Sequence, residues 1–195
     1  ALITFSKIDI LINNAGLSMR ALFNELDLSV LKNLMDVNFW GTVYCTKYAL
    51  PEILKTKGSV VGVSSIAGYR GLPGRTGYSS SKFAMNGFME SLRTELLKTG
   101  VHVMVACPGF TASNIRVTAL AKDGASHGET SMEEGKMMSA DTVAQTIADG
   151  IIARKRTLIM TGQGKLTVWL NKLFPALADK LVFNHFTKEK NALIK

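Results

Sequence analysis

The chain has 195 residues, of which 47% are hydrophobic and 19% are charged, so it is long enough to bury a core in one globular domain. This composition excludes a disordered or fibrous protein. The net charge of +8 comes mostly from residues 154–195, where nine Lys or Arg accompany two Asp or Glu. These basic residues alternate with Leu, Phe and Trp instead of forming a tract, so we expect no nucleic-acid binding.

Metal binding and secretion are not indicated by the sequence. Cys45 and Cys107 lie far apart, with no CxxC pair and no histidine at metal-ligand spacing, which predicts two buried, reduced thiols and no metal site. The first apolar run is interrupted by Lys7 and Asp9 and has no basic leader, unlike a signal peptide. No apolar segment reaches the length of a membrane span, and we expect a cytoplasmic protein.

Short β-branched apolar runs alternate along the chain with longer periodic stretches, a pattern typical of a parallel sheet with crossover helices. The predicted strands are residues 8–12, 59–63, 101–106 and 157–160. The predicted helices are residues 29–56, 79–98 and 140–154. Ser139 is expected to cap the last helix, with Asp141 in its first turn. Residues 113–138, rich in Gly, Ser, Glu and Met, predict a loop.

The first predicted strand, residues 8–12, is almost entirely apolar, which suits a strand with neighbours on both sides. Nothing upstream in the chain covers it, and natural proteins rarely leave such an edge open. We therefore expect that further strand–helix units precede this sequence in the parent protein.

The segment GRTGYSSSK, residues 74–82, places a tyrosine and a lysine four residues apart in a stretch that is poor in helix formers. Residues at i and i+4 share one helix face, so Tyr78 and Lys82 are expected to project into one cleft. A phenol with an ordinary pKa of about 10 is a poor proton shuttle at neutral pH, and an ammonium within about 4–6 Å lowers that pKa. We predict that Lys82 and the helix N-terminus lower the pKa of Tyr78.

Five short motifs occur in a fixed order on suitable elements. They are NNAG at 13–16, VNFWG at 37–41, VSSIAG at 63–68, YSSSK at 78–82 and PG at 108–109. Together they resemble the short-chain dehydrogenase/reductase family. The resemblance covers essentially all of residues 1–195, as one domain, but only the later part of the family's domain, because the glycine-rich dinucleotide fingerprint has no counterpart. It implies a doubly wound parallel-sheet Rossmann fold and hydride transfer between NAD or NADP and a secondary alcohol or carbonyl.

The resemblance also implies roles for individual residues. By it, Tyr78 is the general acid/base, and Lys82 lowers its pKa and holds the nicotinamide ribose. Ser65 matches the serine that binds the substrate oxygen, and Asn38 matches the asparagine that supports a water near the lysine. The residues expected to bind the cofactor are Asn13, Ala15, Gly16, Tyr78, Lys82, Pro108, Gly109, Thr111 and Ser113. The residue that distinguishes NAD from NADP is expected upstream of this sequence.

Two other functions were compatible with parts of the sequence. The segment GVSSI, residues 62–66, approaches the GxSxG nucleophile elbow of hydrolases, but Ile66 replaces the second glycine and would crowd the strained turn. The alternative to an oxidoreductase is a non-catalytic protein that keeps the same fold for binding or membrane association.

The C-terminal segment, residues 165–195, predicts a basic amphipathic tail, with Pro175 opening its second helical part. It fits a membrane-surface anchor bearing Trp169, and it also fits packing on the domain or a partner subunit, which we favour. The residues that share one side of a helical wheel, within about 100°, are Leu166, Leu170, Leu173, Phe174, Leu177 and Leu181.

The family resemblance places the substrate between the segment after PG and the C-terminal region. The apolar residues there are Ile115, Val117, Leu120, Met132, Met137 and Met138. These adaptable side chains predict a hydrophobic alcohol or ketone as substrate. By the same analogy, the predicted helices 29–56 and 79–98 would form the interface of a homodimer or homotetramer.

Overall fold

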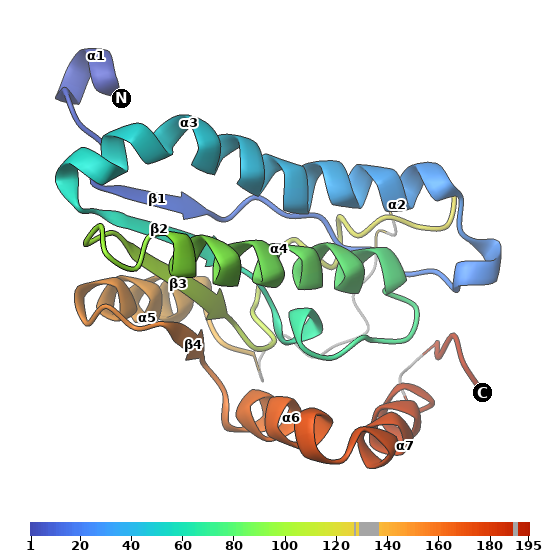
Figure 1. Cartoon of the computed structure of the whole chain (residues 1–195). Helices are drawn as coiled ribbons and strands as arrows, with labels where there is room; N and C mark the ends of the chain where they lie inside the picture. Colours follow the sequence, from blue (N-terminus) through green and yellow to red (C-terminus); the bar gives the residue numbers. More distant parts are fainter. Residues whose placement is uncertain (127, 129–136, 189–190) are drawn as a thin grey trace.

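The structure, a computed structural model, describes residues 1–126, 128, 137–188 and 191–195. Its sheet has four parallel strands in chain order (Figure 1): β1 (Ile10–Asn13), β2 (Ser59–Val63), β3 (His102–Cys107) and β4 (Thr157–Ile159). In the register, Ile10 pairs with Ser59, and Val60 pairs with Val103. The four predicted strands are confirmed, with small shifts at their ends.

The helices of the described chain follow the predicted periodic stretches. They are α1 (Leu2–Phe5), α2 (Leu28–Met35), α3 (Gly41–Thr56), α4 (Thr76–Glu95), α5 (Ala140–Ile152), α6 (Gly162–Leu173) and α7 (Pro175–Phe186). Short 3-10 turns, η1 (Phe23–Glu25) and η3 (Ile66–Gly68), accompany a π-helical turn, η2 (Asp36–Trp40). The predicted helix over 29–56 is therefore interrupted at η2, where it changes from α2 to α3.

The helix termini follow the expected capping chemistry. The side chain of Ser139 accepts a hydrogen bond from the Thr142 N–H at 3.1 Å, and this confirms the predicted N-cap of α5. Pro175 begins α7 as predicted, because proline lacks only an N–H that a first helical residue does not use.

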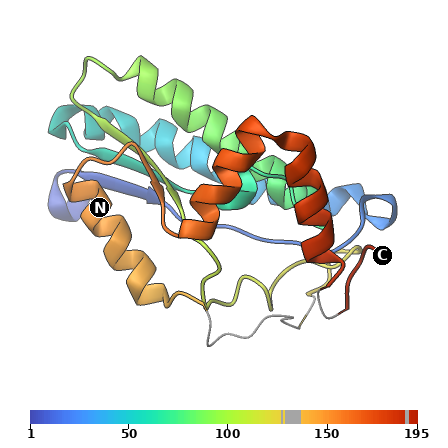
Figure 2. The same cartoon turned by 90° about the horizontal axis from the view of Figure 1, so that it is seen from below.

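The sheet is covered on both faces, as Figures 1 and 2 show: α3 and α4 lie on one side and α5 on the other. Alternate strand residues serve the two cores. Val60 and Val103 pack with Ile53 and Met89 of the first helical layer, whereas Met104 packs with α5. Full burial of each such side chain stabilises the fold by about 1.5–3 kcal/mol. This arrangement is a doubly wound α/β Rossmann-type fold.

Parallel strands place all their carboxyl ends at one edge of the sheet, where the following loops and the start of α4 meet. β1 is the outer strand on one side, and Ile10 and Ile12 remain about half exposed there. Cys107 is buried at the end of β3, but Cys45 is exposed on α3, so the prediction of two buried thiols is wrong for Cys45.

The turn between α3 and β2 brings two backbone segments very close together. The Ser59 N–H donates to the Asp9 carbonyl at 2.8 Å, and a Cβ atom at Gly58 would collide with that same carbonyl. We expect Gly58→Ala to lower the free energy of unfolding by about 3 kcal/mol, because backbone atoms cannot move aside without breaking the strand pairing. Urea unfolding measures the change.

Gly162→Ala is the matched control, because a Cβ atom at Gly162, the first residue of α6, meets open space. This substitution is expected to leave stability unchanged or to raise it by up to about 1 kcal/mol through helix propensity. A Gly58→Ala variant as stable as the parent would contradict the close approach of Asp9 to Gly58.

Candidate active site

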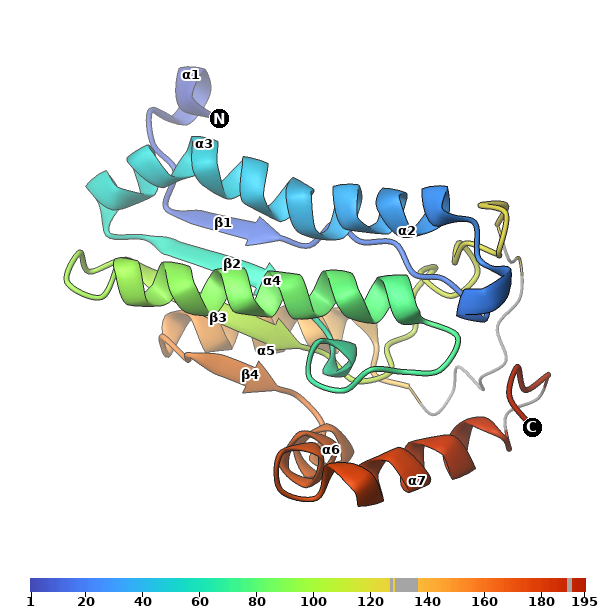
Figure 3. The same cartoon turned by 45° about the vertical axis from the view of Figure 1, so that its right-hand side comes forward.

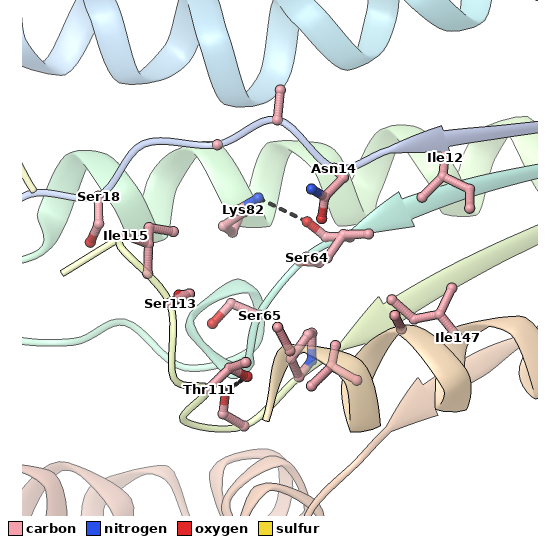
Figure 4. A pocket seen from close by; sticks show the side chains of 18 of the residues that line it. Ile12, Asn14, Ser18, Ser64, Ser65, Lys82, Thr111, Ser113, Ile115 and Ile147 are labelled. Atoms are coloured by element: carbon pink, nitrogen blue, oxygen red, sulfur yellow. Dashed lines mark hydrogen bonds between the residues drawn. The ribbon is translucent and has the colours of Figure 1, made fainter. Parts of the chain in front are cut away.

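A cavity of about 1080 Å³ opens at the carboxyl edge of the sheet (Figure 4). Its walls come from the segments that follow β1, β2 and β3, from the first turn of α4 and from α5. Nine of the eleven predicted site residues line it: Ala15, Gly16, Ser65, Tyr78, Lys82, Pro108, Gly109, Thr111 and Ser113. Asn13 and Asn38 do not.

Tyr78 and Lys82 lie one turn apart on α4, as their spacing predicts. The Lys82 side chain is buried, and its Nζ donates a hydrogen bond to the Val63 carbonyl at 2.9 Å. In Figure 4 this ammonium lies between Asn14, after β1, and the end of β2. A Cβ atom at Gly16 would lie only 3.4 Å from Nζ, so the absence of a side chain there leaves the ammonium facing the cavity.

Ser65 meets Tyr78 across the cavity. The residue is in extended conformation at the N-cap of η3, and its Oγ accepts a hydrogen bond from the Ala67 N–H at 3.1 Å. A hydrogen bond between the Ser65 and Tyr78 side chains also affects the pKa of the phenol. The two hydroxyl groups therefore stand together where a substrate oxygen would contact both.

The acid–base properties of this pair differ from the sequence prediction. Burial raises the pKa of Tyr78, and the hydrogen bond from Ser65 and the positive charge of Arg75 only partly oppose this. The Lys82 Nζ lies 5.9 Å from the centre of the phenol ring and donates its hydrogen bond to Val63. The pKa of Tyr78 is therefore raised, which is opposite to the lowered pKa that the sequence predicts.

Asn38 is fully buried in η2 and acts on the backbone around the cavity. Its Oδ1 accepts from the Leu17 N–H at 2.7 Å, while its Nδ2 donates to the Leu17 carbonyl at 2.9 Å and to Ser81 Oγ at 2.8 Å. Ser81 Oγ in turn donates to the Tyr78 carbonyl at 2.8 Å. Asn38 therefore ties the loop after β1 to the first turn of α4.

Asn13 also faces away from the cavity. Its Nδ2 donates to Thr46 Oγ1 of α3 at 3.1 Å, in a buried contact between sheet and helix. Alternation of side chains along the strand turns the next residue, Asn14, into the cavity, and sequence reasoning omitted it. On the opposite wall the Thr111 Oγ1 donates to the Gly109 carbonyl at 3.1 Å and so tightens the turn that follows β3.

Besides Asn14, sequence reasoning missed two residues that act on Tyr78. Ser81 carries the link from Asn38 to Tyr78, and Arg75 is the cation that opposes the rise in the pKa of Tyr78. At the end of β3, burial raises the pKa of the Cys107 thiol to about 12. Sequence order gave one usable signal: Arg75 lies three residues before Tyr78, and Ser81 three residues after it, both one helical turn away.

The predicted substrate residues are dispersed in the structure. Ile115 lines the cavity, whereas Leu120 packs with the cluster around α2, and Met138 packs against the α5 core. Met132 lies outside the described residues. Leu72 and Phe110 are among the other apolar residues that line the cavity. Within the described part of the chain, no three His, Cys, Asp or Glu side chains are grouped as metal ligands.

The comparison with known proteins assigns the family. The model of the short chain dehydrogenase family matches residues 1–124, which is more than half of the chain. The chain therefore belongs to the short-chain dehydrogenase/reductase family. Dehydrogenase/reductase SDR family member 7B of Mus musculus is 32% identical over 190 residues, which cover 96% of this chain and 59% of that protein. Dehydrogenase/reductase SDR family protein 7-like of Drosophila melanogaster is 33% identical over 193 residues, which cover 98% of this chain and 59% of that protein.

A solved structure supports the fold separately. A short-chain dehydrogenase from Streptomyces avermitilis superposes with a TM-score of 0.71 at 23% identity, over 96% of this chain and 73% of that one. The chain spans about three fifths of the length of its curated relatives.

The buried ammonium of Lys82 makes stability depend on pH in a defined direction. Burial lowers its pKa from 10.5 to about 8, so the folded protein loses this proton before the unfolded chain does. The destabilisation is fully present below about pH 8 and is relieved as the pH rises towards the unfolded pKa. We expect Lys82→Met to raise the free energy of unfolding by about 1–2 kcal/mol near pH 7, after subtracting the lost bond to Val63, and to lose this gain near pH 10.

Urea unfolding of the parent and the variant at both pH values tests this expectation. Lys98→Met, which removes an exposed lysine, is the control and is expected to stay close to the parent throughout. A gain that is constant or grows with pH would contradict the burial of a charged ammonium at Lys82.

Proposed function

We propose that the protein is an NAD(P)-dependent oxidoreductase that transfers a hydride between a nicotinamide cofactor and a secondary alcohol or carbonyl. The observation that carries the proposal is the meeting of Ser65, Tyr78 and Lys82, from two different elements, at one cavity. Two hydroxyl groups and one ammonium at the end of a parallel sheet supply a binding site for a carbonyl oxygen and a route for its proton.

The proposed chemistry begins with the two hydroxyl groups. The Ser65 hydroxyl, oriented by its bond with the Ala67 N–H, donates a hydrogen bond to the substrate oxygen and polarises the carbonyl. Tyr78 is protonated at neutral pH because its pKa is raised, so it donates its proton to the oxygen as negative charge develops there. In the oxidation direction Tyr78 must first lose that proton, so this direction benefits from alkaline pH.

The residues present fit the nicotinamide ribose end of the cofactor. Lys82 uses one N–H on Val63 and retains two for other acceptors, and Gly16 leaves its ammonium accessible. Ala15, Gly16, Pro108 and Gly109 offer a wall with little side-chain bulk for a flat ring, and Thr111 and Ser113 place hydroxyl groups beside it. When bound, NAD(H) or NADP(H) supplies or accepts the hydride.

The proposed substrate is hydrophobic. Leu72, Phe110 and Ile115 line the same cavity as the two hydroxyl groups, and such side chains favour an apolar ring or chain over a sugar or a charged acid. The carbonyl oxygen is then the polar end that Ser65 and Tyr78 recognise, while the apolar body lies against these three side chains.

Tyr78→Phe is the test of the mechanism, in the full-length protein. Removing the proton donor is expected to lower kcat/KM for carbonyl reduction by about 10²–10⁴-fold, measured as NAD(P)H oxidation with a panel of hydrophobic ketones and small polar carbonyls. Tyr48→Phe, which alters an exposed tyrosine of α3, is expected to keep the parent activity. Retained activity in Tyr78→Phe would remove the phenol from the mechanism. Turnover of the small polar carbonyls alone would contradict the proposed hydrophobic substrate class.

We also propose that the protein forms a homodimer or homotetramer through the outward face of α3 and α4. Trp40, Tyr44 and Tyr48 are exposed along this face together with Phe83 of α4. Trp40 and Tyr44 stack with their ring centres 5.6 Å apart, which gives the face a rigid aromatic surface.

The double variant Tyr44→Arg/Phe83→Arg is expected to shift the mass measured by light scattering from oligomer to monomer, because it buries unpaired charge in the proposed contact. Leu181→Arg, on exposed α7, is the control and is expected to leave the mass unchanged. A parent protein that is monomeric at all concentrations would contradict this interface.

A further inference from the structure

The hairpin formed by α6 and α7 has an unusual distribution of polar and apolar residues. Figure 3 shows it on the outside of the molecule, following β4. The inward side of α6 is small and polar. Gly164 packs against Ile66, and Asn171 donates to the Tyr69 carbonyl at 2.9 Å and accepts from Arg70 at 2.9 Å. Polar contacts therefore hold α6 to the domain.

The second helix is attached in a similar way. Asp179 of α7 forms an ion pair with Arg70, and the guanidinium of Arg75 lies 5.4 Å from the ring centre of buried Phe186. Ala178 is the other side chain of α7 that is buried. The segment between Ser65 and Tyr78 thus anchors both helices.

Apart from the buried Phe186 and the partly buried Leu170, the large apolar side chains of the hairpin point outward. They are between 46% and 59% exposed and comprise Leu166, Trp169, Leu173, Phe174, Leu177, Leu181 and Phe183. The rings of Trp169 and Phe174 meet edge to face with their centres 6.0 Å apart, so the outward sides of the two helices are continuous at the elbow. Of the two alternatives predicted for this tail, packing of the stripe on its own domain is wrong for these residues.

The predicted apolar stripe is shared between two helices, because α6 ends at Leu173 and α7 begins at Pro175, where the sequence predicts the second helical part. Each helix keeps its own outward apolar set. On α6 the set recurs at i, i+3 and i+7, and on α7 Leu177 and Leu181 recur at i and i+4, which is the spacing of one helix face.

The charges around this face select its partner. Lys165, Lys172 and Lys180 are exposed on the same two helices. Asp179 is the one acidic side chain in the described part of residues 154–195, and it is engaged by Arg70. A two-fold contact between copies would bring two lysine borders together without acidic partners, which is unfavourable. An apolar face bordered by lysines instead matches a surface that is apolar beneath and negatively charged above.

We propose that the α6–α7 hairpin is a docking surface for an anionic lipid bilayer. The outward leucines and Trp169 enter the boundary between headgroups and acyl chains, and the lysines contact the headgroup phosphates and carboxylates. The hairpin lies along the surface: in the described residues no helix combines the length and the apolar character needed to cross a bilayer. This surface is independent of the proposed hydride transfer, since none of its outward residues lines the cavity.

Sedimentation with vesicles tests the docking surface, using the full-length protein and vesicles of phosphatidylcholine with or without phosphatidylserine. The parent is expected to bind the vesicles that contain phosphatidylserine, and added salt is expected to weaken this binding. The triple variant Leu166→Gln/Leu173→Gln/Leu177→Gln is expected to bind roughly tenfold less or weaker still. Leu97→Gln removes a leucine beyond α4 that is still more exposed, and this control is expected to match the parent.

Charge reversal separates the electrostatic part. Lys172→Glu/Lys180→Glu is expected to abolish the preference for phosphatidylserine over phosphatidylcholine vesicles. A second measurement places the contact at the hairpin itself: lipids brominated on their acyl chains are expected to quench tryptophan fluorescence in the parent, and Trp169→Phe is expected to lose that quenching. All substituted side chains are exposed, so circular dichroism is expected to show unchanged folding.

Three results would overturn the proposal. The first is equal vesicle binding by the parent and the triple variant. The second is quenching that persists unchanged in Trp169→Phe. The third is a fall in oligomer mass caused by the triple variant in the absence of lipid, because that result would assign the face to a second copy of the chain.

Discussion

The structure of the site depends on one constraint, the burial of a lysine ammonium at the end of a parallel strand. The Lys82 Nζ has the Val63 carbonyl as its protein acceptor, and burial has lowered its pKa to about 8. A charged lysine in this position destabilises the fold near neutral pH, so the packing of other side chains has to hold it there. The side chains of Met85 and Met89, on the same side of α4 as Lys82, pack against the sheet and hold the helix in place.

The polar network around α4 fixes the geometry that the ammonium needs. Asn38, held in the π-helical turn, forms three side-chain hydrogen bonds with Leu17 and Ser81. The Ser81 hydroxyl in turn donates a hydrogen bond to the Tyr78 carbonyl. Buried amides with all these bonds made are rigid, because any displacement leaves a polar atom unpaired. A π-helical turn weakens the hydrogen-bond geometry of a long helix. Here the turn η2 orients the Asn38 amide, and this accounts for the break between α2 and α3. The position of Asn38 is thus structural support for the first turn of α4.

The sequence predicted the strands and helices well because both faces of this sheet are covered. Two-sided burial makes β2 and β3 continuous apolar runs, and these contrast strongly with the periodic helices between them. The spacing of Tyr78 and Lys82 predicted their common face for the same reason, since it depends only on helix geometry. The nine cavity residues were predicted from the order of the five motifs, because these motifs mark the segments that follow the strands and the start of α4.

The wrong predictions concern which way a side chain faces and how deeply it is buried in the folded protein. Strand alternation decided whether Asn13 or Asn14 faces the cavity, and the strand end could not be located to one residue from the sequence. A lowered pKa of Tyr78 was predicted from the neighbouring charge and the helix N-terminus, but desolvation by burial is the larger effect and raises that pKa. The helical wheel drawn for the C-terminal segment gave no information about which side of each helix faces the domain.

The C-terminal hairpin connects these observations. Arg70 and Arg75 lie between Ser65 and Tyr78 in the chain, and each bonds or packs against a residue of α6 or α7. Arg75 also lowers the pKa of Tyr78, so the packing of Phe186 against its guanidinium helps to fix a charge that acts on the phenol. The hairpin therefore has two distinct sides with two distinct tasks. Its inward side holds the segment that carries the hydroxyl groups through polar contacts and buried Phe186. Most of its other large apolar side chains are exposed on the outside of the molecule.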